Sequence, residues 1–487
     1  MPPDFSDHLH LDHHSISGLF KSRVALYTGI TAAILTVFLL AQPSLPRSLH
    51  FKPVVDQFTS SPSQYLFGDF QPVHKNVAVA SMFPFHEDVY LTIVQQMEDL
   101  LAPYDGRVQV YSPTPLPYGF QDIVDDLELY SGSFKAPKDF LPALQSTQFD
   151  KPIDLVLLGT CNFDFRDWGK EMIAIWDSRP ADQKFQVACV AHNLNDMHYW
   201  SDDFTALSER GVLRIIAIAD HVAHAFHEFF QDLADEPELI ASGFEYIKTD
   251  VHVPVLDLPP RTRTPSQVLS QAVVQGFFSP ERRDYARLFQ ELTQAILEDP
   301  AVWGYQALNA TSEKVFKPIP DSSVPPFQLN LAGEGYLEVP HVLRNVVKKH
   351  AGLSYPEFYD LMESMDVVIP AFATNIYYEK QASSTVVMAI ECDVPMLVTH
   401  RFRESYTYAD DDRVLITRPQ GLSEIGALKV FRTQQYIPTP GDLPEFVHDV
   451  HEMLDGGWKR PVEGFQAMKK ELWKRNKDVA RRILTDQ

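Results

Sequence analysis

Short apolar runs alternate with segments of helical periodicity along most of the chain. Strands buried in a parallel sheet form continuous runs of valine, isoleucine and leucine, whereas covering helices carry apolar residues three and four positions apart. A first series has expected strands at 76–81, 107–112, 152–160, 185–193, 213–220 and 246–255, and expected helices at 87–102 and 221–233. This alternation predicts a parallel sheet with helices on both faces.

The alternation stops at residues 257–268, whose three prolines and two arginines predict a linker, and then restarts. The second series has expected strands at 271–278, 327–335, 344–352, 366–372, 394–399 and 411–419, and expected helices at 280–299, 354–365 and from Ala382. Two helices with charged faces follow at 444–454 and 467–484.

The two series predict an α/β fold with two doubly wound, Rossmann-like domains that face a cleft. We expect an N-terminal domain at 76–262, a C-terminal domain at 263–433 and a C-terminal helical tail at 434–487. Ligands of such sheets bind beyond the carboxyl ends of the strands, where the strand order reverses.

The segment before the first domain is of another kind. Residues 24–41 carry no charge, and as a helix they would span roughly 27 Å, close to the thickness of a bilayer core. We expect a transmembrane signal anchor at 24–41, a short tail at 1–23 and a stem at 42–75. A cleaved signal peptide is the alternative, although its apolar region is usually shorter and nearer the N-terminus.

Charge does not orient this span, because basic residues flank it on both sides. The short segment before it and the large body after it predict a single-pass type II membrane protein with a luminal body in the Golgi or endoplasmic reticulum. Asn309 begins the only Asn-x-Ser/Thr sequon and is the expected glycosylation site.

Charge and cysteine content narrow the function classes. The net charge of −23 argues against a general nucleic-acid-binding protein, although a local basic site could still hold a phosphate. The three cysteines, Cys161, Cys189 and Cys392, show no metal-ligand spacing. Their apolar surroundings favour buried thiols, and a single disulfide stays open.

A helix start at Ala382-Ser383-Ser384-Thr385 is the first candidate site. Free backbone N–H groups at a helix start can hold an anion, and hydroxyl side chains can add to them. Simple N-capping by serine or threonine is the alternative interpretation.

The ordered set of segments resembles a known family. The stretch "VVKKHAGLSYPEFYDLMESMDVVIPAF", followed by "SSTVVMAIECDVPMLVT", is similar to the nucleotide-sugar half of GT-B glycosyltransferases. It looks most like the retaining glycosyltransferase family 4, in a divergent fungal branch. The resemblance implies a nucleotide-sugar donor linked to UDP or GDP, no cofactor or metal, and a glycan, lipid or protein acceptor.

Three departures from the family pattern concern charged side chains. Aligned on Pro395, the two family glutamates fall on Met388 and Lys380, with Glu379 next to the latter. The family glycine before that proline is Asp393, and of the family's arginine and lysine after the first strand only the lysine has a cationic counterpart, Arg282.

The resemblance implies a role for each candidate residue. Donor diphosphate binding is assigned to Arg282, Ser383, Ser384 and Thr385, and the nucleotide and sugar pocket to Gly276, Gly333, Glu334 and His350. His192 and Glu379 are the catalytic candidates, and His86 lies in an expected acceptor loop. On this register the neighbouring Arg283 has no role, and Asp410–Asp412 is interpreted as a solvated turn, not as a metal site.

These features predict a membrane-anchored glycosyltransferase that moves a hexose to an unknown acceptor, with retention of configuration. The missing glutamate pair motivates an alternative, a non-catalytic GT-B-like binding or scaffold protein of the secretory pathway. A sugar-nucleotide epimerase is a third hypothesis.

Overall fold

Two six-stranded parallel sheets organise the residues that the computed structural model describes, which are 70–146, 152–199, 201–237, 239, 242–262, 264, 266–308 and 315–486. All of them belong to one compact unit, 69–487. The expected tail 1–23, the expected membrane span 24–41, most of the expected stem 42–75 and Asn309 lie outside the described residues.

The first sheet has the strand order β2-β1-β3-β4-β5-β6. Its strands are β1 (Asn76–Ala80), β2 (Arg107–Tyr111), β3 (Leu155–Leu158), β4 (Gln186–Ala191), β5 (Leu213–Ala217) and β6 (Lys248–Val251). β1 is buried along its whole length, and its Val77 lies opposite Val108 on one side and Leu155 on the other. A strand covered on both faces requires such an unbroken apolar run.

The helices of this half are α2 (Glu87–Leu101), α3 (Phe120–Asp126), α4 (Phe140–Gln145), α5 (Cys161–Ser178), α6 (Ser201–Glu209) and α7 (Asp220–Asp235). The sequence pattern predicted α2 and α7 but missed α5 and α6. In α5 the buried stripe of Phe165, Trp168 and Met172 is interrupted by charged residues, which hides its periodicity.

The second sheet has the strand order β12-β11-β10-β7-β8-β9. Its strands are β7 (Gln271–Gln275), β8 (Gln328–Ala332), β9 (Val347–His350), β10 (Val367–Val368), β11 (Met396–Val398) and β12 (Leu415–Thr417). The strand order reverses between β7 and β10, so the loops that follow these two strands are where a doubly wound sheet gathers its ligand groups. The expected α/β architecture of two doubly wound domains is therefore present.

The helices of the second half are α8 (Tyr285–Glu298), α9 (Tyr355–Glu363), α10 (Ile376–Glu379), α11 (Ser384–Glu391), α12 (His400–Ser405), α13 (Glu424–Thr433), α14 (Pro444–Gly456) and α15 (Val462–Thr485). Short 3-10 segments are Ala102–Tyr104, Pro117–Gly119, Pro137–Asp139, Ala181–Gln183, Leu194–Tyr199, Phe244–Tyr246, His341–Leu343 and Thr407–Ala409.

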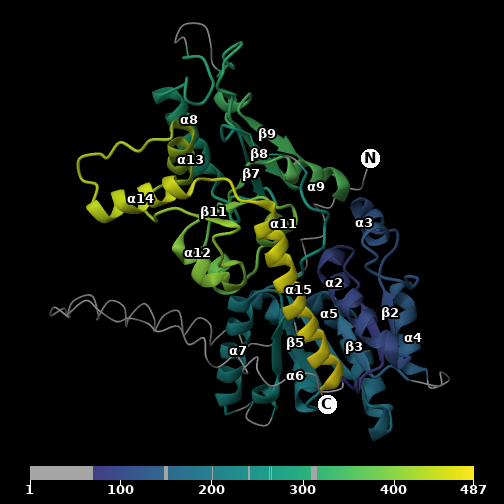
Figure 1. The fold of residues 1–487 in the computed structure, drawn as a ribbon. Coiled ribbons are helices and arrows are strands. Elements are labelled where there is room, and N and C mark those ends of the chain that lie inside the picture. Colours follow the sequence, from purple (N-terminus) through teal and green to yellow (C-terminus); the bar gives the residue numbers. More distant parts are fainter. Residues whose placement is uncertain are drawn as a thin grey trace, which may run out of the picture. The chain divides into compact units, whose positions relative to one another are not determined.

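The last helix, α15, packs against both halves, beside α11 and beside α2 (Figure 1). At its start Lys469 forms a buried ion pair of 2.9 Å with Asp393, which follows α11, and also donates to the carbonyl of Glu391. Farther along, the Asn476 side chain accepts from the N–H of Val253 and donates to its carbonyl. The helix thereby ties the end of the first half to the sheet of the second.

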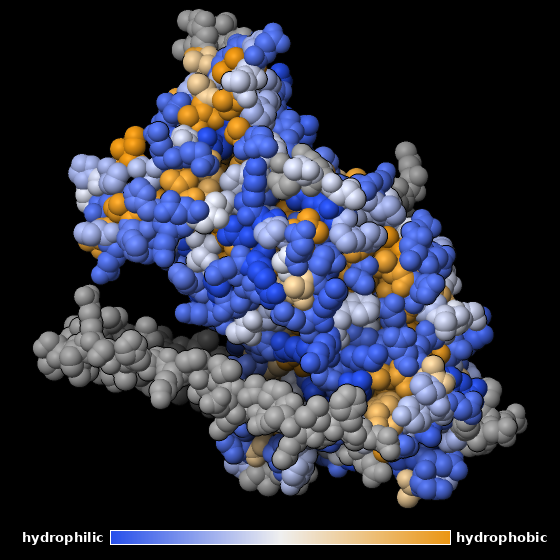
Figure 2. All heavy atoms as spheres, viewed as in Figure 1, coloured by the Kyte–Doolittle hydropathy of each residue, from blue (hydrophilic) through white to orange (hydrophobic). Residues whose placement is uncertain are grey.

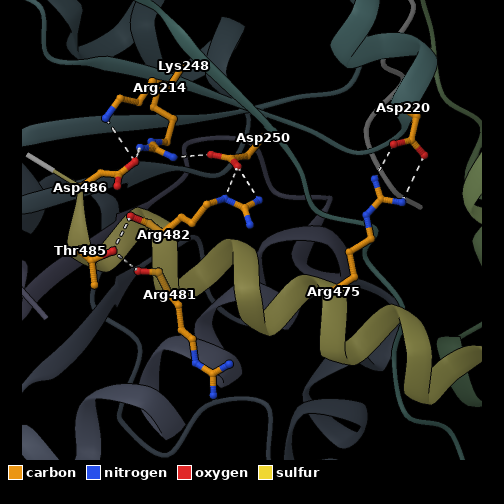
Figure 3. A network of polar contacts seen from close by, with 9 residues as sticks. All are labelled: Arg214, Asp220, Lys248, Asp250, Arg475, Arg481, Arg482, Thr485 and Asp486. Atoms are coloured by element: carbon orange, nitrogen blue, oxygen red, sulfur yellow. Dashed lines mark hydrogen bonds and ion pairs between the residues drawn. The ribbon is translucent and has the colours of Figure 1, made fainter. Parts of the chain in front are cut away.

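The final turns of α15 attach to the first sheet through charged side chains (Figure 3). Arg482 pairs with Asp250 at 2.7 Å, and Asp250 also pairs with Arg214. Asp486, just after the helix, contacts Arg214 and Lys248. This alternation of acids and bases fastens the C-terminal segment to β5 and β6.

Cys161 and Cys189 form a disulfide, so the expectation that they are buried thiols is wrong for this pair. Cys189 lies on β4 opposite Leu158 at the end of the neighbouring strand β3, and Cys161 follows that strand. The adjacent strands bring the two Cα atoms to 5.3 Å, within the range for a bridge. Cys392 is a buried free thiol, as expected.

No helix among the described residues is long and apolar enough to cross a membrane, and the expected span 24–41 is not among them. On the face shown in Figure 2, hydrophilic residues predominate and apolar residues occur in small separate groups. That distribution fits the net charge of −23.

The buried pair of Lys469 and Asp393 yields a stability prediction. Lys469→Met should destabilise the fold by roughly 3–5 kcal/mol, because it leaves the Asp393 carboxylate buried without its cation. Arg481→Met removes an exposed ion pair from the same helix and should change stability by about 1 kcal/mol or less. Urea denaturation of the two variants measures the difference, and equal effects would contradict a structural role for the buried pair.

Candidate functional site

A cleft of about 690 Å³ lies beyond the carboxyl ends of strands from both sheets. Its first-domain wall comes from the loops after β1, β3 and β4, and its second-domain wall from the loops after β7, β8 and β9 and from the start of α11. Backbone contacts join the two walls, because Ala382 N–H donates to His192 and Leu194 N–H donates to Lys380. The expected cleft between the domains is therefore present.

Arg283 is a cation at this cleft without a carboxylate partner among the described residues. Its side chain is almost fully buried and lines the second-domain wall. It donates to the hydroxyls of Ser383 at 3.2 Å and Thr385 at 3.0 Å, and to the carbonyls of Gln275 and Arg282. These four bonds use four of the five N–H groups of a guanidinium. The rings of Phe372 and Tyr377 lie 5.1 Å from the guanidinium carbon, but no carboxylate of the described chain pairs with it.

Other buried arginines in the described chain also donate to carbonyls, so burial alone does not indicate a ligand site. The buried Arg179 and the half-buried Arg432 bond backbone oxygens in this way, but neither lines the cleft. What distinguishes Arg283 is its position at the switch point of the sheet, next to the start of α11.

Of the four residues expected to bind the diphosphate, three line the cleft and one does not. Ser383 and Ser384 line the cleft at the start of α11, and Ser384 is exposed. Thr385 is fully buried and donates to Gln275, so its hydroxyl does not face the cleft. Arg282 lines the cleft with an exposed guanidinium 5.5 Å above the ring of Phe277. The sequence analysis gave Arg283 no role, whereas in the structure its guanidinium donates to the hydroxyls of Ser383 and Thr385.

Gly276 and Gly333 allow the loops after β7 and β8 to touch. Both have positive φ angles, 134° and 155°. A Cβ atom on Gly333 would lie 1.9 Å from the carbonyl oxygen of Gly276, and one on Gly276 would lie 2.8 Å from the Arg283 guanidinium. Glycine is therefore required at both positions for Arg283 to reach the cleft.

Glu334 and His350 lie on the same wall, one strand farther toward the sheet edge. Glu334 accepts a hydrogen bond of 2.6 Å from the N–H of Gly352, and His350 contacts the side chain of Asn330 at 2.9 Å. Burial and nearby Lys348 lower the pKa of His350. These groups offer a carboxylate and a neutral imidazole beside open glycine backbone.

Glu379 does not take the place of the family glutamates. It ends α10 outside the cleft, more than half exposed, and its carboxylate is 3.5 Å from Arg401. Met388, which aligns with a family glutamate, lines the cleft instead. The expected catalytic position of Glu379 thus conflicts with where its side chain lies.

His86 and His192 form a stacked pair on the opposite wall, with ring centroids 4.2 Å apart. Burial lowers the pKa of His192 to about 4, and burial together with His192 lowers the pKa of His86. Both rings are therefore neutral at physiological pH. The Nε2 atom of His192 is buried and has no hydrogen-bond partner among the described residues.

Two carboxylates beside His86 received no role from the sequence. Asp88 lines the cleft, and burial raises its pKa to about 6. Glu87 is fully buried without a hydrogen-bond partner for either oxygen, and burial raises its pKa to about 7. Their burial depends on the tertiary fold, which the sequence pattern at the start of α2 does not show.

No family model matches the sequence, and no curated protein matches it. Solved structures show a distant likeness. The apo lipopolysaccharide outer core galactosyltransferase WaaB has 11% identity and a TM-score of 0.41, over 83% of this chain and 98% of that one. An α-glucosyltransferase in complex with UDP-glucose and DNA containing an abasic site has 8% identity and a TM-score of 0.43, over 84% and 96%.

A UDP-N-acetylglucosamine 2-epimerase from Rickettsia bellii has 8% identity and a TM-score of 0.38, over 84% of this chain and 95% of that one. Likeness at this level assigns neither an activity nor a substrate to this chain. Membership of glycosyltransferase family 4 and of its fungal branch stays a prediction.

The buried carboxyl of Glu87 predicts a pH-dependent stability. Between its ordinary pKa of 4.5 and its folded pKa of about 7, the unfolded chain loses this proton while the folded chain keeps it. Folding therefore weakens as the pH rises through this window. Glu87→Gln should stabilise the protein at pH 8 by up to roughly 3 kcal/mol relative to its effect at pH 4.5.

Thermal unfolding between pH 4.5 and 8 measures this effect. Asp99→Asn, at an exposed position on the same helix, controls for the general loss of a negative charge. A Glu87→Gln difference that does not change with pH would show that folding does not raise the pKa of this carboxyl.

Proposed function

We propose that this chain is a glycosyltransferase that binds the diphosphate of a nucleotide sugar in the cleft. The observation that carries this proposal is Arg283, a buried cation without a carboxylate partner among the described residues, at the switch point of a Rossmann-like sheet. A diphosphate would supply the missing negative charge, and a guanidinium binds phosphate oxygens well.

The start of α11 adds neutral donors to this cation. Ser384 presents a hydroxyl and backbone N–H to the cleft, and Ser383 already contacts Arg283. The exposed Arg282 provides a second cation on the same wall. Together these groups would stabilise the charge that the leaving diphosphate gains when the glycosidic bond breaks.

The nucleoside would lie toward β8 and β9. Gly352, where an added Cβ atom would meet only the Glu334 carboxylate at 3.8 Å, allows a base or ribose to approach the backbone there, and Glu334 can accept hydrogen bonds from it. The wall does not by itself choose between uracil and guanine, so UDP-linked and GDP-linked donors both fit the proposal.

The transferred hexose would then face the first-domain wall, near the ring of His192. In the reaction the bond between the anomeric carbon and the diphosphate oxygen breaks, and a bond to the acceptor hydroxyl oxygen forms. The hydroxyl proton leaves with the nucleoside diphosphate. His192, being neutral, would orient a sugar hydroxyl by hydrogen bonding, and a retaining outcome follows from the family resemblance alone.

The compartment is part of the proposal. A luminal body anchored by residues 24–41 would fold under oxidising conditions, where disulfides form and persist. The bridge between Cys161 and Cys189 fits such a place.

A non-catalytic nucleotide-binding protein is the second candidate, and the position of Glu379 favours it. That carboxylate pairs with Arg401 outside the cleft, while Met388 occupies the wall where the family places a glutamate. Release of a nucleoside diphosphate from a sugar donor in the presence of acceptors decides between the two. Tight nucleotide binding without any release would select the non-catalytic function.

The diphosphate site predicts a ranking of variants. Arg283→Ala should weaken binding of UDP or GDP roughly ten- to a hundred-fold, the equivalent of about 1.5–3 kcal/mol for a charge-assisted contact. Arg282→Ala should weaken it less, since this side chain is exposed, and Ser384→Ala least, since its backbone N–H remains. Isothermal titration calorimetry measures the affinity of each variant. Arg166→Ala, at an exposed position that does not line the cleft, is the control.

Because Arg283 also bonds Ser383, Thr385 and Gln275, a folding defect must be separated from a binding defect. Arg283→Lys keeps the charge and should retain part of the affinity. Wild-type affinity in a folded Arg283→Ala variant, together with a large loss in Arg282→Ala, would restore the register expected from the sequence and assign Arg283 a structural role.

A further inference from the structure

The first-domain wall of the cleft is a series of aromatic rings in contact. Tyr118 and Phe85, both exposed, lie 6.1 Å apart between ring centroids at the outer end. Phe85 packs edge-on against Phe83 at 5.2 Å, and Phe83 stacks on Phe163 at 4.6 Å. We call these four rings the aromatic wall. They come from the loop after β1, from the 3-10 segment Pro117–Gly119 and from the start of α5.

Polar groups adjoin the inner end of the aromatic wall. The His86 ring lies 4.8 Å from that of Phe83 and stacks on His192. The Asp88 carboxylate lines the same part of the cleft, and no lysine or arginine of the described chain pairs with it. A ligand on this wall would therefore meet ring faces first and hydrogen-bonding groups farther in.

The charges of the cleft are separated. Among the described residues that line it, the lysine and arginine side chains are Arg282 and Arg283, both on the second-domain wall, whereas the first-domain wall contributes the carboxylate of Asp88. An acceptor that carries a phosphate or sulfate would bring a like charge toward Asp88. The exposed Arg166 guanidinium lies 5.2 Å from the centroid of the Phe163 ring, but it already pairs with the Asp167 carboxylate at 3.2 Å. The first-domain wall thus disfavours anionic acceptors.

We propose that the aromatic wall is an acceptor subsite for an uncharged carbohydrate, an inference that rests on the proposed glycosyl transfer. The C–H face of a sugar ring packs on aromatic rings, and its hydroxyls can bond the carboxylate of Asp88 and the imidazoles of His86 and His192. An alkyl chain would cover the rings but leave these polar groups without partners, which is unfavourable in a desolvated cleft.

Saturation-transfer NMR on the full-length protein, without any donor, tests the subsite directly. The probes are methyl α-mannoside, methyl β-galactoside and cellobiose as neutral sugars, and mannose 6-phosphate as the anionic counterpart. Farnesol and choline represent an apolar chain and a cation. At least one neutral sugar should bind, and mannose 6-phosphate should bind at least tenfold more weakly than methyl α-mannoside.

Variants locate the binding. Phe85→Ala and Tyr118→Ala should each weaken the neutral sugar roughly five- to tenfold, in line with the loss of about 1–1.4 kcal/mol of ring contact. Tyr246→Ala removes an exposed tyrosine of the same domain that does not line the cleft and should have no effect. Asp88→Asn should narrow the gap between the neutral and the phosphorylated sugar.

Two outcomes overturn this inference. One is binding of mannose 6-phosphate as tight as that of the neutral sugars. The other is binding of farnesol or choline at the aromatic wall without binding of any neutral sugar. Neutral sugar binding in a protein that binds no nucleoside diphosphate would instead leave the subsite standing and overturn the proposed transferase.

Discussion

The position of α15 is the constraint on which the rest of the structure depends. Its Lys469 neutralises Asp393 in a fully buried pair, and its Asn476 pairs both backbone groups of Val253. These contacts attach one helix to the second sheet at its start and to the first sheet at its end. Because a buried carboxylate without its cation is strongly unfavourable, the pair holds α15 against the segment that follows α11.

Asp393 also accounts for a departure in the sequence. The resemblance places a glycine at this position, and the residue has a φ of 54°, in the left-handed region that glycine enters most easily. Aspartate tolerates this conformation, and here its carboxylate receives Lys469, Gln466 and the N–H of Arg261. The aspartate therefore adopts a backbone conformation that favours glycine, and its carboxylate holds both the linker and α15.

The two walls of the cleft differ in their charge and in their side-chain types. The second-domain wall combines Arg283 with the start of α11 and with glycines that let the loops after β7 and β8 touch. The first-domain wall combines aromatic rings with neutral imidazoles and carboxylates. An anionic group suits the former and an uncharged hydroxyl compound the latter, which is the pair of ligands that the proposed sugar transfer requires.

The sequence predicted the strands well because strands buried on both faces leave continuous apolar runs, as in 76–80 and 271–275. It missed α5, whose charged residues interrupt the apolar stripe, and it did not resolve the disulfide, because pairing depends on which strands are neighbours. For the site, the start of α11 was predicted from its hydroxyl residues. The sequence did not predict that Arg283, and not Arg282, is the buried cation of the cleft. Two adjacent arginines on a loop differ only in which side chain the fold turns inward.

A crystal structure of the protein with UDP or GDP tests the central claim most directly. The account predicts diphosphate oxygens within hydrogen-bonding distance, about 2.7–3.2 Å, of the Arg283 guanidinium and of the Ser384 backbone N–H, with the nucleoside toward β8 and β9. Two results would contradict it. One is a nucleotide bound elsewhere. The other is a nucleotide in the cleft that makes no contact with Arg283, whose guanidinium stays bonded only to the Ser383 and Thr385 hydroxyls and to two backbone carbonyls.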